Sequence, residues 1–265
     1  MLCEILRNLP EDFPWKDTIR HFPIVDSTNT LAKELAQAGA PHGTVLIADA
    51  QTGGRGRMGR SFHSPAGSGI YLSVILRPGC HASRLMHLTC ATGVAICSAL
   101  EAAVNVKPGI KWTNDLVYGT NKLGGILTEL ALEPDGTVRY AVVGVGINCT
   151  QQPGDFPEDI RNIAISLAMV TGQPISRSTV AAEMIRSLEQ MSQDLLICQT
   201  SIMDAYRKNC ITVGREISVN SCDSIRHGIA ESICDDGGLV VRFEDGHRET
   251  IGAGEVSIRG MYGYI

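Results

Sequence analysis

The 265 residues are 44% hydrophobic and 19% charged, so the chain can build a buried core and is not expected to be disordered. With 23 Lys and Arg against 28 Asp and Glu, the formal charge of −5 disfavours a surface that binds polyanions in general, so any anion site must be local. Charged residues such as Glu4 and Arg7 exclude a signal sequence, and no stretch is expected to approach the ~20 apolar residues needed to cross a membrane.

The nine cysteines contain no Cys-x-x-Cys pair, and their number is odd. Several lie in apolar runs such as residues 88–99. Metal-ligand spacing is absent, and we expect reduced thiols in the core of a cytoplasmic protein.

The pattern of apolar residues predicts both helices and strands over the first 210 residues. After a short lead-in at 1–20, a helix should begin at Ser27-Thr28-Asn29 and end at Gly39, and residues 51–69, with six glycines, should form a loop. Glu133-Pro134-Asp135-Gly136 is a strong turn signal and predicts a hairpin. Strands grouped in hairpins, with helices grouped apart, indicate an α+β fold with a mainly antiparallel sheet flanked by helices. The other predicted helices are 84–104, 163–171, 179–197 and 202–209, and the predicted strands are 44–50, 70–76, 110–112, 123–132 and 139–147.

A different pattern begins near Val213. Short strands are predicted at 216–219, 228–233, 239–243, 249–251 and 256–258, separated by turns rich in Asp and Gly. This spacing predicts a small C-terminal β-barrel, which divides the chain into domains 1–210 and 211–265. The second domain carries five arginines against nine acidic residues, so it should bind nucleic acid poorly.

The most informative segment is Gln51–Arg60, in which arginines alternate with glycines. The spacing of glycines 54, 56 and 59 is that of a dinucleotide fingerprint, yet no helix pattern follows, and no Asp or Glu between Ala50 and Leu100 could bind a ribose. Glycine lets backbone N–H groups approach a ligand, and arginine offers forked donors to carboxylate and phosphate. We therefore predict a loop that orders around an anion; the alternative is a solvated charged turn.

A second cluster, Lys111-Trp112-Thr113-Asn114-Asp115, places an ammonium, an amide and a carboxylate at the end of a predicted strand, and Lys122 follows after a turn. Asn and Asp are natural partners of Mg²⁺. Gly124-Gly125 inside the next strand is costly unless a ligand or another backbone approaches closely. The cluster indicates phosphate and metal chemistry, whereas the alternative is a surface hairpin with a glycine bulge.

A third segment, Val143–Asn148, alternates glycine with branched residues in a predicted strand. One face of this strand therefore lacks side chains and leaves room for a flat group. Tight packing of the strand explains the same pattern equally well.

Taken together and in this order, these segments resemble the catalytic domain of biotin–protein ligases. The family pattern has Ser-Thr-Asn at a helix start, Gly-Arg-Gly-Arg-x-Gly-Arg, Lys-Trp-Pro-Asn-Asp, Lys-x-x-Gly-Ile-Leu and Gly-x-Gly-Ile-Asn, and the match runs through most of residues 22–170. Thr113 stands where the family usually has proline, and Phe62 where Trp is common. The resemblance implies a class II synthetase-like catalytic domain followed by an SH3-like β-barrel.

The resemblance also implies roles for individual residues. Biotin would be bound by Ser27, Thr28, Asn29, Gln51, Gly54, Arg55, Gly56, Arg57, Lys122, Gly124 and Gly125. ATP would be bound by Arg55, Arg57, Arg60, Lys111, Asn114, Lys122 and Asn148, and Mg²⁺ by Asn114 and Asp115. The catalytic residues would be Lys122, Arg55, Arg57 and Asp115; the last could serve the acceptor amine or the metal.

The implied reaction is an ATP-dependent, AMP-forming ligation. Biotin would become biotinyl-5′-AMP and then pass to a lysine in the biotin carboxyl carrier domain of a biotin-dependent carboxylase. The 20 residues before His21 are too few for a DNA-binding helix-turn-helix, so a short monofunctional enzyme without a DNA partner is expected. A homodimer is compatible with the sequence. The alternatives are a lipoate–protein ligase, a DNA-binding regulator and a non-catalytic biotin-binding module.

Overall fold

The computed structural model describes residues 1–220, 225–252, 255–258 and 261. Of the nine cysteines, Cys222 lies outside the described residues. Eight are described, and all eight are free thiols.

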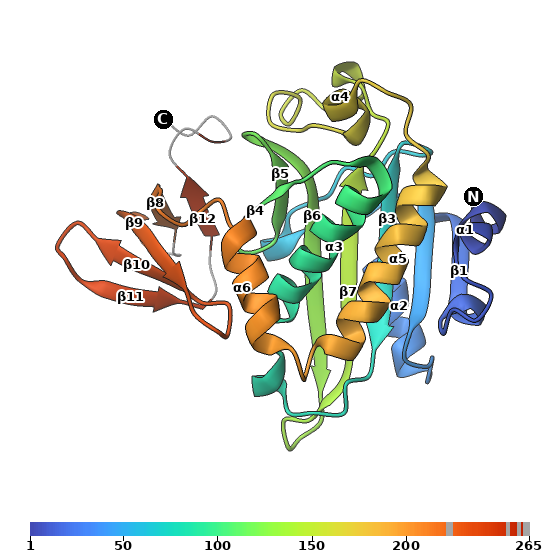
Figure 1. Ribbon diagram of the computed structural model, residues 1–265, viewed down its shortest axis with the longest axis horizontal. Coiled ribbons are helices and arrows are strands. Elements are labelled where there is room, and N and C mark those ends of the chain that lie inside the picture. The colour runs from blue at the N-terminus through green and yellow to red at the C-terminus, as the bar shows by residue number, and fades with distance from the viewer. Residues whose placement is uncertain (221–224, 253–254, 259–260, 262–265) are drawn as a thin grey trace.

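A seven-stranded sheet lies at the centre of the larger part of the molecule (Figure 1). Its strand order is β1-β2-β3-β7-β6-β5-β4; β1 and β2 run parallel, and each of the other neighbouring pairs is antiparallel. The α+β fold with a mainly antiparallel sheet is therefore confirmed, as is the predicted hairpin, formed by β6 and β7. The strands are β1 (Ile19–Val25), β2 (Thr44–Gln51), β3 (Gly69–Leu76), β4 (Gly109–Lys111), β5 (Asp115–Tyr118), β6 (Asn121–Leu132) and β7 (Val138–Asn148).

Helices cover both faces of this sheet (Figure 1). On one face α3 packs against α5, α6 and β6 over the main apolar core, and on the other α2 packs against β2, β3 and β7 over a smaller one. The helices are α1 (Leu2–Asn8), α2 (Thr28–Gln37), α3 (Leu88–Val104), α4 (Leu167–Thr171), α5 (Arg177–Asp194) and α6 (Gln199–Asn209), with short 3₁₀ turns η1 (Lys16–Thr18), η2 (Arg57–Gly59), η3 (Ala82–Leu85) and η4 (Pro153–Asp155).

The helical stretch Ala82–Val104 is long and apolar enough to cross a membrane by length and composition alone. The expectation that no stretch comes near this limit was therefore wrong. The physical reason for the apolar composition is burial: 61% of the apolar window is buried inside the fold, where α3 lies between the sheet, α5 and α6. A helix covered on most sides can be hydrophobic all round without a membrane.

The C-terminal residues form a second, five-stranded sheet with the order β11-β10-β9-β8-β12 and antiparallel pairings throughout (Figure 1). The predicted strands all exist, and β9 begins three residues earlier than expected. Closure of β11 onto β12 is not among the pairings of the described residues, so the barrel stays a prediction, as does the boundary between residues 210 and 211. The strands are β8 (Glu216–Asn220), β9 (Ile225–Ile233), β10 (Leu239–Phe243), β11 (Arg248–Ile251) and β12 (Glu255–Ile258).

The N-terminal lead-in expected at residues 1–20 contains regular structure instead. Helix α1 packs against α5 and buries Ile5 completely. It is seven residues long, which is too short to show a helical period in the sequence. Strand β1 is an edge strand that contains Pro23, and proline is tolerated there because an edge N–H needs no partner in the sheet.

The helix predicted at 163–171 begins only at Leu167. Residues 163–165 pair with strand β6 instead, since the N–H of Lys122 donates to the carbonyl of Ile163 at 2.6 Å and Ile165 donates back at 2.9 Å. Ser166 then caps α4 by accepting a hydrogen bond from the N–H of Met169. A long-range backbone contact therefore overrides the local helical pattern.

Candidate functional site

A cavity lies on the α2 face of the large sheet, covered by the loop between β2 and β3. Residues from seven separate segments line it, so the whole fold contributes to its walls. Among the described residues, these are Ser27, Thr28 and Asn29 at the start of α2, Gln51 at the end of β2, Arg55–Met58 and Arg60–Phe62 in the loop, Lys111, Trp112, Asn114 and Asp115 at the β4–β5 turn, Lys122 and Gly125–Leu127 in β6, Gly144–Gly146 in β7, and Val256 in β12.

The glycine–arginine loop, residues 52–68, folds back on itself as a narrow hairpin. The N–H of Gly56 donates to the carbonyl of Arg60 at 2.7 Å, and the N–H of Phe62 donates to that of Gly54 at 2.8 Å. The tip turns at Met58, whose φ of 55° is uncommon for a residue with a side chain. This geometry brings all three arginines of the loop to the cavity wall.

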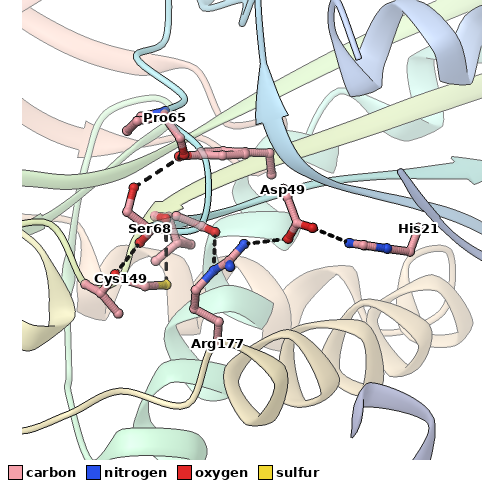
Figure 2. Close-up of polar contacts among 10 residues, drawn as sticks. His21, Asp49, Pro65, Ser68, Cys149 and Arg177 are labelled. Carbon is pink, nitrogen blue, oxygen red and sulfur yellow. Dashed lines mark hydrogen bonds and ion pairs between the residues drawn. The ribbon is translucent and has the colours of Figure 1, made fainter. Parts of the chain in front are cut away.

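Both ends of this loop are fixed to the sheet, as Figure 2 shows. Arg177, the first residue of α5, donates Nε to the carbonyl of Gly69 at 2.8 Å and Nη2 to Asp49 Oδ1 at 3.1 Å. The Asp49 carbonyl accepts from the N–H of Gly67, and His21 Nε2 lies 2.9 Å from Asp49 Oδ2 at ion-pair distance, although without hydrogen-bond geometry. One guanidinium therefore joins the end of β2 to the start of β3, which confines any motion of the loop to the residues between them.

An aromatic side chain of the loop packs on the sheet. The Phe62 ring lies edge-on to Tyr71, with centroids 6.4 Å apart. The Tyr71 hydroxyl donates to the carbonyl of Pro65 at 2.9 Å, and burial raises the pKa of this hydroxyl to about 12, so it remains a donor. Phe62 thus holds an aromatic ring of the loop against the sheet.

The amide end of the cavity (Ser27, Thr28, Asn29 and Gln51) is a network of polar side chains. The N–H and hydroxyl of Thr28 donate to Gln51 Oε1 at 2.8 and 3.1 Å, and Gln51 Nε2 donates to Ser64 Oγ at 2.8 Å. Ser27 is the N-cap residue of α2, yet its hydroxyl makes no cap hydrogen bond, and Gln51 accepts the first helical N–H, that of Thr28. The Ser27 hydroxyl is therefore free to serve the cavity that it lines.

Asn29 is held from three directions. Its Oδ1 accepts from the Ser73 hydroxyl at 2.7 Å, and its Nδ2 donates to the carbonyl of Leu127 at 3.1 Å and to Glu129 Oε2 at 3.0 Å. A Cβ at Gly144 would lie 2.0 Å from Asn29 Oδ1. The room that this glycine leaves is thus filled by an amide of the protein itself.

The remaining strand glycines fall into two kinds. A Cβ at Gly146 would lie 2.5 Å from the Phe62 ring, and a Cβ at Gly124 would lie 2.4 Å from the carbonyl oxygen of Gly146. The flat group predicted against β7 is therefore the protein's own phenyl ring. At Gly125 the nearest atom would be Lys122 Cε at 3.6 Å, an ordinary contact, so Gly125 is the one of these glycines that leaves space for a ligand.

The cationic end of the cavity (Arg57, Lys111, Asn114, Asp115 and Lys122) lies toward the β4–β5 edge of the sheet. The sequence left open whether the chain leaves strand register here. Strand β4 ends at Lys111, the next three residues turn, and Lys111 and Asp115 become cross-strand partners. Lys122 Nζ lies 2.6 Å from Asp115 Oδ1, and Arg57 Nη1 donates to Asn114 Oδ1 at 3.1 Å. The turn thus gathers side chains that an extended strand would separate.

Asn148, predicted to contact adenine, does not line the cavity. Its Nδ2 donates to the carbonyl of Ile165 at 3.1 Å, and Gln151 donates to its Oδ1 at 3.4 Å. Because Ile165 is also bonded to the backbone of Lys122, Asn148 secures the segment behind that lysine. The adenine contact stays a prediction.

The C-terminal part of the chain contacts the site directly. The indole N–H of Trp112 donates to the carbonyl of Gly237, in the β9–β10 turn, at 2.8 Å, and the backbone N–H of Trp112 donates to Thr212 Oγ1 at 2.9 Å. The Tyr206 hydroxyl donates to the carbonyl of Thr113 at 3.1 Å, across a turn whose Trp112–Thr113 peptide bond is cis. Val256 completes the wall. The β4–β5 turn is therefore held between the two sheets.

Charge in the cavity is opposite in sign to that of the chain. Five cations and one carboxylate are among the described lining residues: Arg55, Arg57, Arg60, Lys111, Lys122 and Asp115. Within the described part of the chain, no three His, Cys, Asp or Glu side chains group to hold a metal ion. The Oδ1 atoms of Asn114 and Asp115 contact Arg57 and Lys122, and the binding of Mg²⁺ by these two residues stays a prediction.

Most of the residues singled out in the sequence meet at this cavity. Gly54, Gly124 and Asn148 lie behind its walls instead. Sequence reasoning missed Val256, which no local pattern connects to the site, and Glu129, which contacts two residues of the site, Asn29 and Arg55. The sequence does contain a signal for Glu129. Side chains two positions apart in a strand lie on the same face, so Glu129 shares the face of Gly125 and Leu127.

Comparisons with known proteins agree with this geometry. The biotin/lipoate A/B protein ligase family matches residues 21–148, and the biotin protein ligase C terminal domain matches residues 212–259. The bifunctional ligase/repressor BirA of Bacillus spizizenii is 36% identical over 231 residues, which are 87% of this chain and 71% of that protein. The biotin--[acetyl-CoA-carboxylase] ligase of Mycobacterium tuberculosis is 33% identical over 87% of this chain and 85% of its own. The structure of biotin protein ligase from Aquifex aeolicus in complex with biotin and ATP superposes with a TM-score of 0.74 at 28% identity, covering 91% of this chain and 98% of that one.

Proposed function

The chain belongs to the biotin/lipoate A/B protein ligase family, among its biotin–protein ligases, and we propose that its cavity converts biotin and ATP to biotinyl-5′-AMP and then passes the biotinyl group to a protein lysine. One observation carries the proposal: a single cavity joins an end of neutral hydrogen-bonding groups to an end of cations, beneath a loop with three arginines. Biotin has matching ends, a neutral cyclic urea and a carboxylate.

The amide end suits the urea of biotin. Ser27, Thr28 and Gln51 offer hydroxyls and amide groups, and the hydrogen bonds between Thr28 and Gln51 hold these two residues in place before a ligand binds. Leu127 and Phe62 supply apolar contact for the rings and chain between the two ends. A lipoyl dithiolane has no urea and would leave these polar groups unpaired, which favours biotin over lipoate.

The cationic end suits adenylation. A carboxylate oxygen of biotin attacks the α-phosphorus of ATP, a new O–P bond forms, and pyrophosphate leaves as the bond to its bridging oxygen breaks. Two anions must meet, so Lys122, Arg57 and Lys111 stabilise the charge that concentrates between them. In this step Lys122 would break its contact with Asp115 and would contact the two anions instead. Mg²⁺ held by the phosphates of ATP would neutralise further charge there.

The second step needs a neutral lysine amine. The amine attacks the carbonyl of the mixed anhydride, and AMP leaves as its O–C bond breaks. Asp115 is the one carboxylate among the described lining residues. Once Lys122 moves to the adenylate, the Asp115 oxygen that Lys122 contacted can accept the proton of the amine. The acceptor we propose is the biotin carboxyl carrier domain of a carboxylase, by likeness to the mycobacterial relative named for acetyl-CoA carboxylase.

The setting of the protein is also part of the proposal. Eight described cysteines are free, and five of them are buried, which suits a reducing compartment such as the cytoplasm. The cations gather in a cavity within a chain of net charge −5, which suits a small anionic ligand better than a DNA surface. A homodimer stays a prediction.

The test is the mass of a purified carrier domain after incubation with the protein, Mg-ATP and either biotin or lipoate. We expect a gain equal to a biotinyl group that requires ATP. A lipoyl gain would assign the lipoate reaction instead. Pyrophosphate release without a mass gain would support adenylation but reject the carrier domain as acceptor. The absence of both pyrophosphate release and a mass gain would reject catalysis in favour of a binding module.

A further inference from the structure

Glu129 joins three elements around the cavity without lining it. The residue lies in β6 and faces α2, from which Lys33 Nζ approaches Glu129 Oε1 at 2.7 Å and Asn29 Nδ2 donates to Oε2 at 3.0 Å. Arg55 of the glycine–arginine loop brings Nη1 to 3.5 Å from the same Oε1. One carboxylate is therefore the meeting point of strand, helix and loop.

The surroundings of Glu129 favour its charged form. Its side chain is 24% exposed, and burial raises its pKa, but the hydrogen bonds from Lys33 and Asn29 and the charges of Lys33 and Arg55 outweigh burial and lower the pKa overall. Two cations share one anion, so the cluster keeps an excess of positive charge beside the cavity. The mechanism above gives Glu129 no contact with a reacting atom.

Two of the three arginines of the loop, Arg55 and Arg57, have separate anchors. Arg57 donates to Asn114 at the cationic end, whereas Arg55 pairs with Glu129 on the side of α2. Since the ends of the loop are fixed by Arg177 and Asp49, these contacts act on the residues between them that can move. The Glu129 contact is thus not a duplicate of the Asn114 contact, because it secures the opposite side of the hairpin.

We propose that Glu129 is a positioning residue of the ligase: it holds Arg55, and with it the glycine–arginine loop, against α2, so that the loop stays closed over the biotinyl adenylate between the two half-reactions. This inference rests on the proposed function. It assigns Glu129 an effect on how long the intermediate is retained, rather than on the attack of biotin on ATP. Retention matters because a mixed anhydride that escapes is hydrolysed by water.

The experiment measures release of radiolabelled biotinyl adenylate from the enzyme after rapid gel filtration. We expect Glu129→Gln to release it about three- to tenfold faster, an effect sized for a partly exposed ion pair, while biotin-dependent pyrophosphate exchange at saturating biotin changes much less. Arg55→Gln should release it at least as fast, because it also removes a cation from the cavity wall. The double variant should be no worse than Arg55→Gln alone, because both substitutions remove the same Glu129–Arg55 contact.

Two controls separate positioning from general damage. Glu133→Gln removes another carboxylate from the hairpin formed by β6 and β7 and breaks the 2.8 Å contact of Glu133 with Arg139. This variant should leave release of the adenylate unchanged. Added salt should speed release from the wild type more than from Glu129→Gln, since salt screens the contacts of the cavity cations with the adenylate in both proteins but screens the Glu129–Arg55 pair only in the wild type. Loss of a structural contact alone would not produce this difference in salt response.

Two outcomes would overturn the inference: multiplied effects in the double variant, or wild-type release in Glu129→Gln. If Glu129→Gln does not fold, the release rate of Arg55→Gln and the salt response of the wild type test the inference without it. A salt-independent release in the wild type would then overturn the inference. A wild type that forms no adenylate would instead reject the proposed function.

Discussion

The two ends of the cavity are built on different principles. At the amide end three of the four side chains belong to a hydrogen-bonded network: Thr28 is bonded to Gln51, Gln51 to Ser64, and Asn29 to Ser73. The cationic end contains two pairs of side chains, Lys122 with Asp115 and Arg57 with Asn114. A network is difficult to change at one point, whereas a pair can exchange its partner for a phosphate or carboxylate.

This difference teaches how one cavity can both recognise and react. The network fixes donors and acceptors before the ligand arrives, so little ordering is left for binding to achieve. The ion pairs keep the cations in place while leaving them free to move to charge that develops in the reaction. Damage to the network should therefore reduce stability together with binding, and damage to the pairs should reduce chemistry while the fold survives.

The largest expected effect is at the cationic end. Lys122→Ala removes the ammonium that faces both anions, so biotin-dependent pyrophosphate exchange should fall by at least ~100-fold, the size typical for removal of one preorganised donor. The thermal midpoint should change little, because the Lys122 side chain is one-third exposed. Near-normal exchange in this variant would show that the cationic end has another purpose.

How far the sequence predicts this site depends on the range of the contacts. Motifs within one segment, such as Gly54–Arg60 or Lys111–Asp115, predicted their place in the cavity because neighbours in sequence stay neighbours in space. The filled spaces opposite Gly144 and Gly146 could not be predicted, since Asn29 and Phe62 come from distant segments. The contact of Trp112 with Gly237 spans 125 positions, and no local pattern encodes it.

Glycines sharpen the comparison, because they test packing at both ends with the same substitution. Gly144→Ala would place a Cβ 2.0 Å from Asn29 Oδ1 and should lower the free energy of unfolding by about 1–3 kcal/mol, the usual cost of overpacking. Gly125→Ala meets only ordinary contacts and should leave stability within about 0.5 kcal/mol, yet weaken biotin binding by narrowing the cavity.

Urea denaturation and calorimetric titration with biotin measure these two effects. Equal losses of stability in the two variants would contradict the distinction between a filled and an open glycine. Unchanged biotin affinity in Gly125→Ala would place the ligand elsewhere in the cavity.

A smaller effect separates the two half-reactions within the cationic end. Asp115→Asn keeps the size of the side chain but removes its charge, so transfer from preformed biotinyl adenylate to the carrier domain should slow by about tenfold or more, as expected when a general base is lost. Single-turnover mass spectrometry follows transfer, and pyrophosphate exchange follows adenylation. If adenylation alone slows, Asp115 positions Lys122 or a phosphate and is not the base.

The smallest expected effect is a pH dependence where the network meets the loop, at Glu129. Because its folded-state pKa lies below the ordinary value of 4.5, its charged contacts contribute stability that is fully present above that value and is lost as the pH falls through the folded pKa. The difference in free energy of unfolding between the wild type and Glu129→Gln should not exceed about 1 kcal/mol near neutral pH. Urea titrations at descending pH should show the difference shrinking below pH 4.5, since the protonated carboxyl and the amide are then both neutral. A difference that persists after Glu129 is protonated would mean that shape, rather than charge, ties Glu129 to Lys33 and Arg55.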